Sequence, residues 1–233
     1  MKPYLILVLT LTLSSASSAQ AVNLWSTTPV KNENLRSELL EMSQAEAKAT
    51  DEFLEGMSDA GVSLEDDDSL TTVQALIIGF HVLKENCLEL QISQRLAEIV
   101  DEFGWPGESL VGKDGAKAAA RLIRIAEHDR EFQRKCLKLM KDAPRGEVSP
   151  KCIAFLTDAL LVADGKKQRF GTAYNSDMVL EPIEDIVSLD ERRKAMELPL
   201  LALQADILKQ AYLNIEAETG YNLNESFSQD DSD

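Results

Sequence analysis

The spacing of apolar residues along the chain predicts a mostly helical protein. In residues 34–57 and 70–103 the apolar positions recur every three or four residues, which is the repeat of a helix with one buried face. The same repeat predicts further helices over four ranges: 114–141, 150–163, 190–195 and 199–217. No internal repeat is visible, so we expect a single helical-bundle-like domain of mainly α class over residues 22–217.

Several residues mark where these helices begin and end. Gly104 suits the position just beyond a helix, and Pro106 cannot continue one because it lacks an N–H group. Ser149 followed by Pro150 is a typical helix start, and Gly165 ends the helix that it opens.

The helical repeat is lost between residues 166 and 187. Aromatic and β-branched residues are interrupted there by Gly171, Asn175 and Pro182. This pattern predicts a small β-hairpin or an irregular polar insert.

The N-terminus has the features of a secretory signal peptide over residues 1–21. Lys2 precedes an apolar run from Tyr4 to Leu13, and Ala19-Gln20-Ala21 fits a cleavage site before Val22. A membrane anchor is the alternative, but the run is about half of the ~20 residues that a span needs. We therefore expect a periplasmic or extracellular protein without stable membrane insertion, ending in a disordered acidic tail over residues 218–233.

The net charge of −16 argues against nucleic-acid binding, because an acidic surface repels phosphate backbones. The acidic runs lack the spacing of a calcium loop, and there is no CxxC pair or repeated Glu-x-x-His motif. His81 and Glu85 are one helical turn apart, but an ordinary core or surface role is the preferred interpretation. We predict no metal and no cofactor.

The three cysteines are Cys87, Cys136 and Cys152. An odd number in an exported chain allows at most one internal disulfide, and Cys136 and Cys152 could form it. The preferred alternative is that all three are buried small hydrophobic residues.

The predicted helix 114–141 carries the densest group of titratable residues. Helical geometry places Asp129 and Gln133 near the middle of its apolar face, and His128 at the edge. Burying an unpaired carboxylate or amide costs several kcal/mol, on the order of 2–7 for a neutral polar group. Either a polar site between helices offsets this cost, or a local network closed by Arg or Lys does, or the helix is rotated so that Asp129 reaches water.

A second polar group follows in the turn from Gln168 to Thr172. Gly171 lets the backbone bend there, so that the turn can present donors and acceptors. The alternative is a tight hairpin in which Phe170 fills the core. Arg192 and Arg193 add positive charge nearby, and we expect one to pair with Asp129 or Asp158 and the other to face solvent.

Five segments occur in a distinctive order: Gly104-Trp105-Pro106; His128 with Phe132-Gln133; Phe155 to Asp158; Gly165 to Thr172; and Asp190 to Arg193 followed by Leu198-Pro199-Leu200. This order resembles an uncharacterised bacterial family with a Gly-Trp-Pro turn, a Gln-His-Ala-Asp helix, a Tyr-Leu-Thr-Asp-Arg helix and a Gln-x-Tyr-Gly-Thr-Gln turn. The resemblance covers about residues 35–210 and implies a domain of unknown function. Four residues depart from the pattern: Glu127, Asp129, Ala159 and Ala173.

These patterns lead to two hypotheses, and they leave enzymatic activity open because no nucleophile or phosphate-loop motif is present. In the first, a polar pocket between helices binds or hydrolyses a small polar ligand, with His128 as general acid or base and Asp158 as its orienting group. The ligand-binding residues would be Gln133, Gln168, Thr172 and Arg192. In the second, the protein is a noncatalytic structural or interaction protein, and the same residues form a buried hydrogen-bond network.

Overall fold

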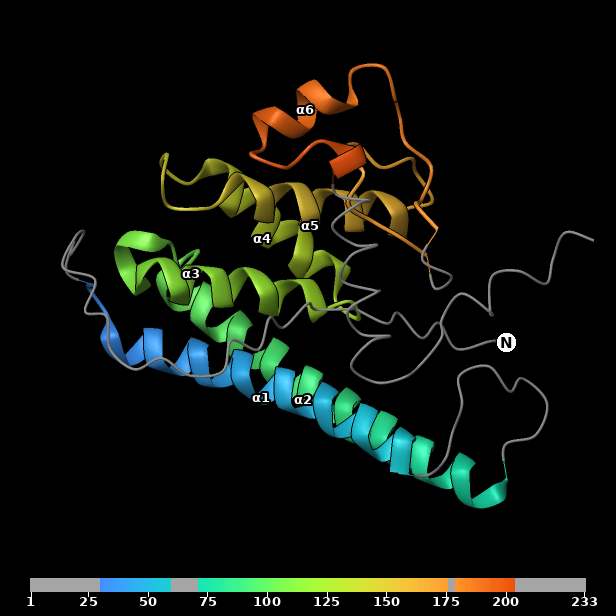
Figure 1. Cartoon of the computed structure of the whole chain (residues 1–233). Coiled ribbons are helices and arrows are strands. Elements are labelled where there is room, and N and C mark those ends of the chain that lie inside the picture. Colours follow the sequence, from blue (N-terminus) through green and yellow to red (C-terminus); the bar gives the residue numbers. More distant parts are fainter. Residues whose placement is uncertain (1–29, 60–70, 176–178, 204–233) are drawn as a thin grey trace, which may run out of the picture.

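The computed structural model describes residues 30–59, 71–175 and 179–203 (Figure 1). Its helices are α1 (Glu33–Asp59), α2 (Thr72–Phe103), α3 (Glu108–Ile125), α4 (Arg130–Asp142), α5 (Pro150–Ala163) and α6 (Leu189–Ala195). The mainly α prediction is confirmed. The expected signal peptide, the acidic tail and most of the helix expected over 199–217 lie outside the described residues.

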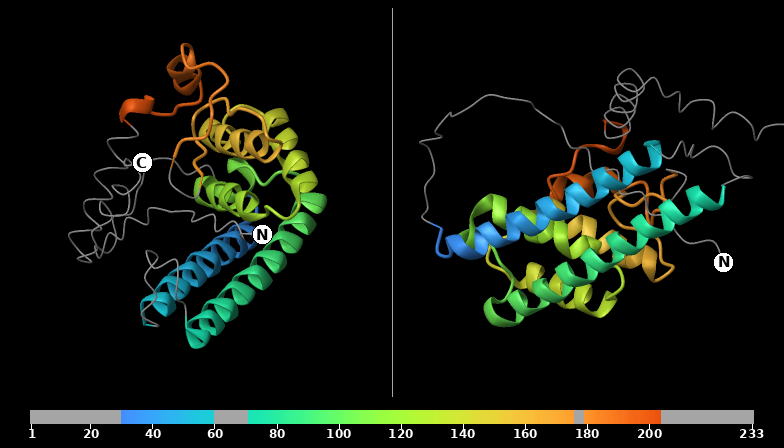
Figure 2. Two further views of the ribbon diagram at one scale, coloured as in Figure 1. Left: turned by 90° about the vertical axis from the view of Figure 1, so that its right-hand side faces the viewer. Right: turned by 90° about the horizontal axis from the view of Figure 1, so that it is seen from below.

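Helices α1 and α2 form a long hairpin that extends beyond the body made by α3, α4 and α5, while α6 lies on the far side of that body (Figures 1 and 2). The two hairpin helices run antiparallel, because Arg95 pairs with Glu38 near one end and Lys84 pairs with Glu52 near the other. Helix α3 runs parallel to α1. Their first turns are joined by the bond from Asn32 N to Leu110 O (2.9 Å) and by the Arg36–Asp114 ion pair.

The main core lies where all five long helices meet. Each contributes apolar side chains that are at most 7% exposed, among them Leu39, Leu96, Leu122, Phe132 and Leu156. A second, smaller cluster contains Ala154, Phe170 and Leu198. It joins α5 to the irregular insert, so Phe170 does fill a core position.

The single helix expected over residues 114–141 is wrong, because the chain breaks between α3 and α4. Asp129 has a non-helical backbone (φ −121°, ψ 78°) and accepts a hydrogen bond from Phe132 N (2.9 Å), which makes it the N-cap of α4. Its side chain is therefore exposed, and it does not lie in the middle of an apolar face. At the other end, the regular part of α3 begins after Gly112, whose φ of 73° interrupts the helix.

Helix α5 ends at a left-handed glycine, and the irregular insert begins there. Gly165 has φ 68°, its N–H bonds to Val162 O (2.9 Å), and Lys166 N bonds to Leu161 O (2.9 Å), the pattern of a Schellman cap. Within the described part of the insert, two isolated bridges take the place of regular strands: Gln168 with Ile183, and Tyr174 with Leu180. The chain returns through α6 onto the same side of α5.

The cysteines differ from the preferred expectation in one respect. All three are free thiols, with Cys136 buried and Cys152 half-buried, but Cys87 is exposed on α2. Burial raises the pKa of Cys136 to about 12 and also raises that of Cys152, so both behave as unreactive thiols.

Candidate functional site

Asp158 lies at the centre of the polar group that the sequence predicts. Its carboxylate is fully buried on α5 and accepts four donors from the turn that follows. Arg169 N reaches Oδ1 at 2.8 Å, Phe170 N lies 3.1 Å from both oxygens, and Thr172 donates to Oδ2 through its N–H (3.1 Å) and its hydroxyl (2.8 Å). Successive backbone N–H groups of this kind often bind a phosphate. Here the chain's own carboxylate fills the concavity.

Gln168 joins the two arms of the insert. Its side chain is fully buried, donates to the carbonyls of Ala173 (2.9 Å) and Glu181 (2.6 Å), and accepts from Ala173 N (2.8 Å). Its backbone bonds to Pro182 O and accepts from Glu184 N, each at 2.9 Å. The backbone and the side chain of Gln168 together supply the hydrogen bonds that a regular β-hairpin would form between its two strands.

Arg193 closes the turn from the side of α6. It is fully buried and donates to Phe170 O (2.7 Å), Gly171 O (2.9 Å) and Pro199 O (2.7 Å). Burial lowers the pKa of its guanidinium, since the charged form loses water. The positive φ of Gly171 (66°) turns the carbonyls of Phe170 and Gly171 toward Arg193. A Cβ on residue 171 would lie 3.5 Å from Nη1 of Arg193.

Arg192 binds the outer edge of the same turn. Its Nε donates to Arg169 O at 2.8 Å, and its two terminal nitrogens bond to Ser188 Oγ and Asp185 O. The expected pairing of one arginine with Asp129 or Asp158 is not among these contacts: Arg192 forms an ion pair with Asp185 (3.5 Å), and Arg193 donates to carbonyl oxygens.

The structure thus brings Asp158, Gln168, Thr172 and Arg192 into one network, which we call the clip together with Arg193. Every clip residue comes from α5, the 168–172 turn or α6. The oxygens of Asp158 and the amide of Gln168 are engaged inside the protein and have no exposed surface. A group that acts on a substrate has to reach it, so these two side chains serve the fold in this conformation.

His128 and Gln133 belong to the break between α3 and α4. His128 is exposed there. Gln133 is fully buried and donates to Ile123 O (2.9 Å) and Arg124 O (3.2 Å), the carbonyls that the end of α3 leaves without helical partners. Its own oxygen accepts from Arg130 Nη1 at 2.9 Å, so the buried amide is part of a local network closed by an arginine.

Glu127 is the one perturbed acid beside His128. Burial raises the pKa of its carboxyl, and the Arg130 guanidinium 3.5 Å away only partly opposes this. The pair lies next to the exposed imidazole of His128 in the sequence. The hydrogen bonds of the clip given above do not involve His128, Glu127 or Gln133.

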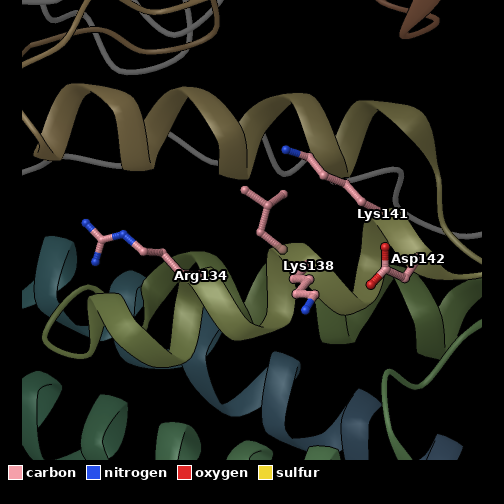
Figure 3. Close-up of a pocket in the computed structure, with 5 residues that line it drawn as sticks. Arg134, Lys138, Lys141 and Asp142 are labelled. Atoms are coloured by element: carbon pink, nitrogen blue, oxygen red, sulfur yellow. The ribbon is translucent and has the colours of Figure 1, made fainter.

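A shallow surface depression of about 280 Å³ runs along α4, lined by Leu137, Asp142 and three basic residues. Figure 3 shows Arg134, Lys138 and Lys141 spread along the helix with their charged ends apart. They do not converge on one point, and Arg134 already pairs with Asp164. The depression therefore lacks the convergent donors of a built anion site.

Within the described residues, no group of three His, Cys, Asp or Glu side chains is placed to hold a metal ion. The same part of the chain has no helix both long and apolar enough to cross a membrane. The side chains of His81 and Glu85 lie outside what the structure describes.

Residues 80–216, more than half of the chain, match the DUF6624 family model. The chain belongs to DUF6624, a family of unknown function. The DUF6624 match contains the whole clip as well as the α3–α4 break. No curated protein and no solved structure matches the chain.

Arg193 is the residue of the clip whose role the sequence did not predict. The signal is local: Leu189, one turn earlier in α6, is 2% exposed, so a residue four positions later lies on the same buried side. Because Arg192 is rotated from it by about 100°, the two arginines cannot have the same surroundings.

Proposed function

We propose that this chain is an exported, noncatalytic interaction protein in which the clip holds a recognition loop in a fixed shape. The observation that carries the proposal is the complete internal engagement of Asp158 and Gln168, which leaves these residues without an atom to offer a ligand. Export is supported by the N-terminal pattern of a basic residue, an apolar run and Ala19-Gln20-Ala21.

The loop that the clip supports exposes apolar side chains. Ile186 is 69% exposed and Val187 is 92% exposed, although both are β-branched residues that ordinarily lie inside. Their backbone is fixed on both sides: Glu184 N bonds to Gln168 O before them, and Arg192 holds Asp185 and Ser188 around them.

A loop held in this way loses little conformational freedom when it binds, which lowers the entropic cost of association. Exposed apolar residues on a rigid scaffold are typical of a protein-binding surface. The neighbouring acids Glu184 and Asp185 are exposed, so the complementary partner is a protein with an apolar depression bordered by basic residues.

Site-specific photo-crosslinking tests the proposal. A photoreactive amino acid replaces Val187 in one full-length chain, and Lys167, also exposed in the insert, in a matched control. We expect a discrete protein adduct from position 187 that is absent from position 167 and lost on adding Ile186→Asp. Adducts of equal yield from both positions, or none, would contradict the proposal.

The ligand hypothesis is tested in parallel by a thermal-shift screen of small polar compounds. Ligand binding to the native state raises its unfolding temperature by mass action. A compound that raises the unfolding temperature of the wild type, but not that of His128→Ala or Thr172→Val, would support the ligand pocket around His128 over the interaction function.

A further inference from the structure

One face of α2 carries a stripe of exposed apolar residues. Leu76, Leu83 and Leu90 follow one another at intervals of seven residues and are 69%, 65% and 45% exposed. Phe80, which is 67% exposed, and the exposed Cys87 occupy the positions between them. The resulting steps of four and three residues form the heptad pattern of a coiled coil, with leucine at every d position.

The stripe lies on the side of α2 opposite its buried residues. The buried residues of α2 include Ile92, which is 4% exposed, and Leu96 and Ile99, which are fully buried. Ile92 lies nine positions after Leu83, a rotation of about 180° around the helix. The stripe therefore points away from α1 and α3, on the half of α2 that extends beyond the body (Figures 1 and 2).

We propose that two copies of this chain pair in parallel through the α2 stripe, so that Cys87 of one copy faces Cys87 of the other. Parallel pairing sets each a position against the same a position of the second helix, whereas antiparallel pairing sets a against d. Because the buried face lies opposite, the two bodies project to opposite sides of the paired helices and do not obstruct them.

Electrostatics permit this contact despite a net charge of −16 per chain. The positions that flank an a/d seam are e and g, which in this stripe include Lys84, Asn86 and Gln91, all exposed. None of the e and g positions from Ile77 to Ser93 is acidic. Two strongly acidic chains can therefore meet along this line with little repulsion.

The area of the stripe explains the presence of a thiol within it. Residues 76–90 span about 21 Å, and a helix about 10 Å wide gives a footprint of roughly 200 Å². A stable interface buries about 800 Å² on each partner, so apolar contact alone gives only weak pairing. A covalent bond at Cys87 makes the weak pair permanent.

The expected separation suits a disulfide. Packed helices lie about 8–10 Å apart and their Cα atoms lie about 2.3 Å from each axis, so facing residues have Cα atoms about 3.4–5.4 Å apart, a range that overlaps the one a disulfide spans. Disulfides need about 4.4–6.8 Å. With oxidised glutathione as oxidant, one Cys87 thiolate displaces glutathione to form a mixed disulfide, and the second Cys87 displaces the other glutathione. One S–S bond forms, one breaks, and both protons and electrons pass to the two glutathione thiols.

The test uses the purified full-length chain in oxidised glutathione, followed by non-reducing electrophoresis and mass spectrometry of the cross-linked peptide. We expect a dimer joined by Cys87 alone, absent from Cys87→Ser, and formed about tenfold or more slowly by Leu83→Asp, which keeps the thiol but loses an apolar contact. Val179→Asp, a change of the same kind at a 58% exposed position off the stripe, should cross-link like the wild type.

Two results would overturn the proposal. In the first, Leu83→Asp cross-links as fast as the wild type, which would mean that exposed thiols merely collide. In the second, the wild type stays monomeric under oxidation. Sedimentation of the reduced chain provides a readout without the disulfide. Concentration-dependent dimerisation should occur in the wild type and in Val179→Asp, and it should be lost in Leu83→Asp.

Discussion

Asp158→Asn tests the clip with the smallest change in shape. The substitution keeps the size of the side chain but replaces one acceptor oxygen by an NH2 group. All four groups around the carboxylate are donors: the backbone N–H groups of Arg169, Phe170 and Thr172, and the Thr172 hydroxyl. Whichever way the amide is turned, it places a donor against at least one backbone donor.

The magnitude follows from the bonds that cannot be rebuilt. The Thr172 hydroxyl can rotate and accept from the new amide, so its bond is preserved in altered form. One or two backbone N–H groups lose a charged acceptor, and each such bond contributes about 1.5–3 kcal/mol. We expect the free energy of unfolding to fall by about 2–4 kcal/mol, which lowers the melting temperature by roughly 5–15 °C in a chain of this size.

Urea unfolding followed by circular dichroism measures this loss, and hydrogen exchange locates it. The amides of Arg169, Phe170 and Thr172 should exchange much faster in the variant, because they bond directly to the carboxylate. Asp142→Asn, at the exposed end of α4, is the control for removing one negative charge and should change stability by less than about 0.5 kcal/mol. If Asp158→Asn is as stable as this control and its amides remain protected, the clip does not hold the insert.

Two further substitutions test the surroundings of the clip and the α3–α4 break. Arg193→Lys should lower the free energy of unfolding, measured in urea, by about 2–4 kcal/mol. Arg193 reaches Pro199 O and Phe170 O through different nitrogens, and one ammonium group cannot span both oxygens. A loss no larger than that caused by Lys194→Met, at an exposed position, would contradict this prediction. Glu127→Gln should stabilise the protein at pH 7: burial raises the pKa of Glu127 in the folded state above its unfolded value, so the wild type gains stability as pH falls through the folded pKa. The stabilisation of Glu127→Gln over the wild type at pH 7 should stay below about 1 kcal/mol, because the Glu127 side chain is 38% exposed. Urea unfolding should show that this difference vanishes near pH 4. An equal difference at both pH values would refute the raised pKa of Glu127.

Local signals in the sequence predicted the helices and most of their ends. Gly104 and Gly165 both adopt positive φ just beyond a helix, where a residue without Cβ is favoured. The break before α4 was missed because the apolar repeat continues across it. The capping preference of Asp129 was the contrary signal, and it outweighs the weak helix propensity of that residue.

Burial of polar groups was predicted less completely, since it depends on partners far away in the sequence. Gln133 was expected to be buried and to need partners, and its partners are the carbonyls that the missed break releases. The grouping of Asp158 with the 168–172 turn came from motif order, and the structure supplies its physical reason in the hydrogen bonds of the clip. Helical spacing from Leu189 places Arg193 on the buried side of α6, but it does not identify the partners of Arg193, because only the folded chain brings the Pro199 carbonyl within reach.

The position of α1 shows that the main core extends beyond the region that matches the family. The region shared with the family begins at residue 80, inside α2, and leaves α1 out. Yet Leu35 and Leu39 of α1 are 4% and 0% exposed, and α1 lies along both α2 and α3. A fragment confined to the shared region would expose apolar surface that α1 now covers. The region shared with the family therefore does not contain the whole of the main core, because α1 supplies part of it.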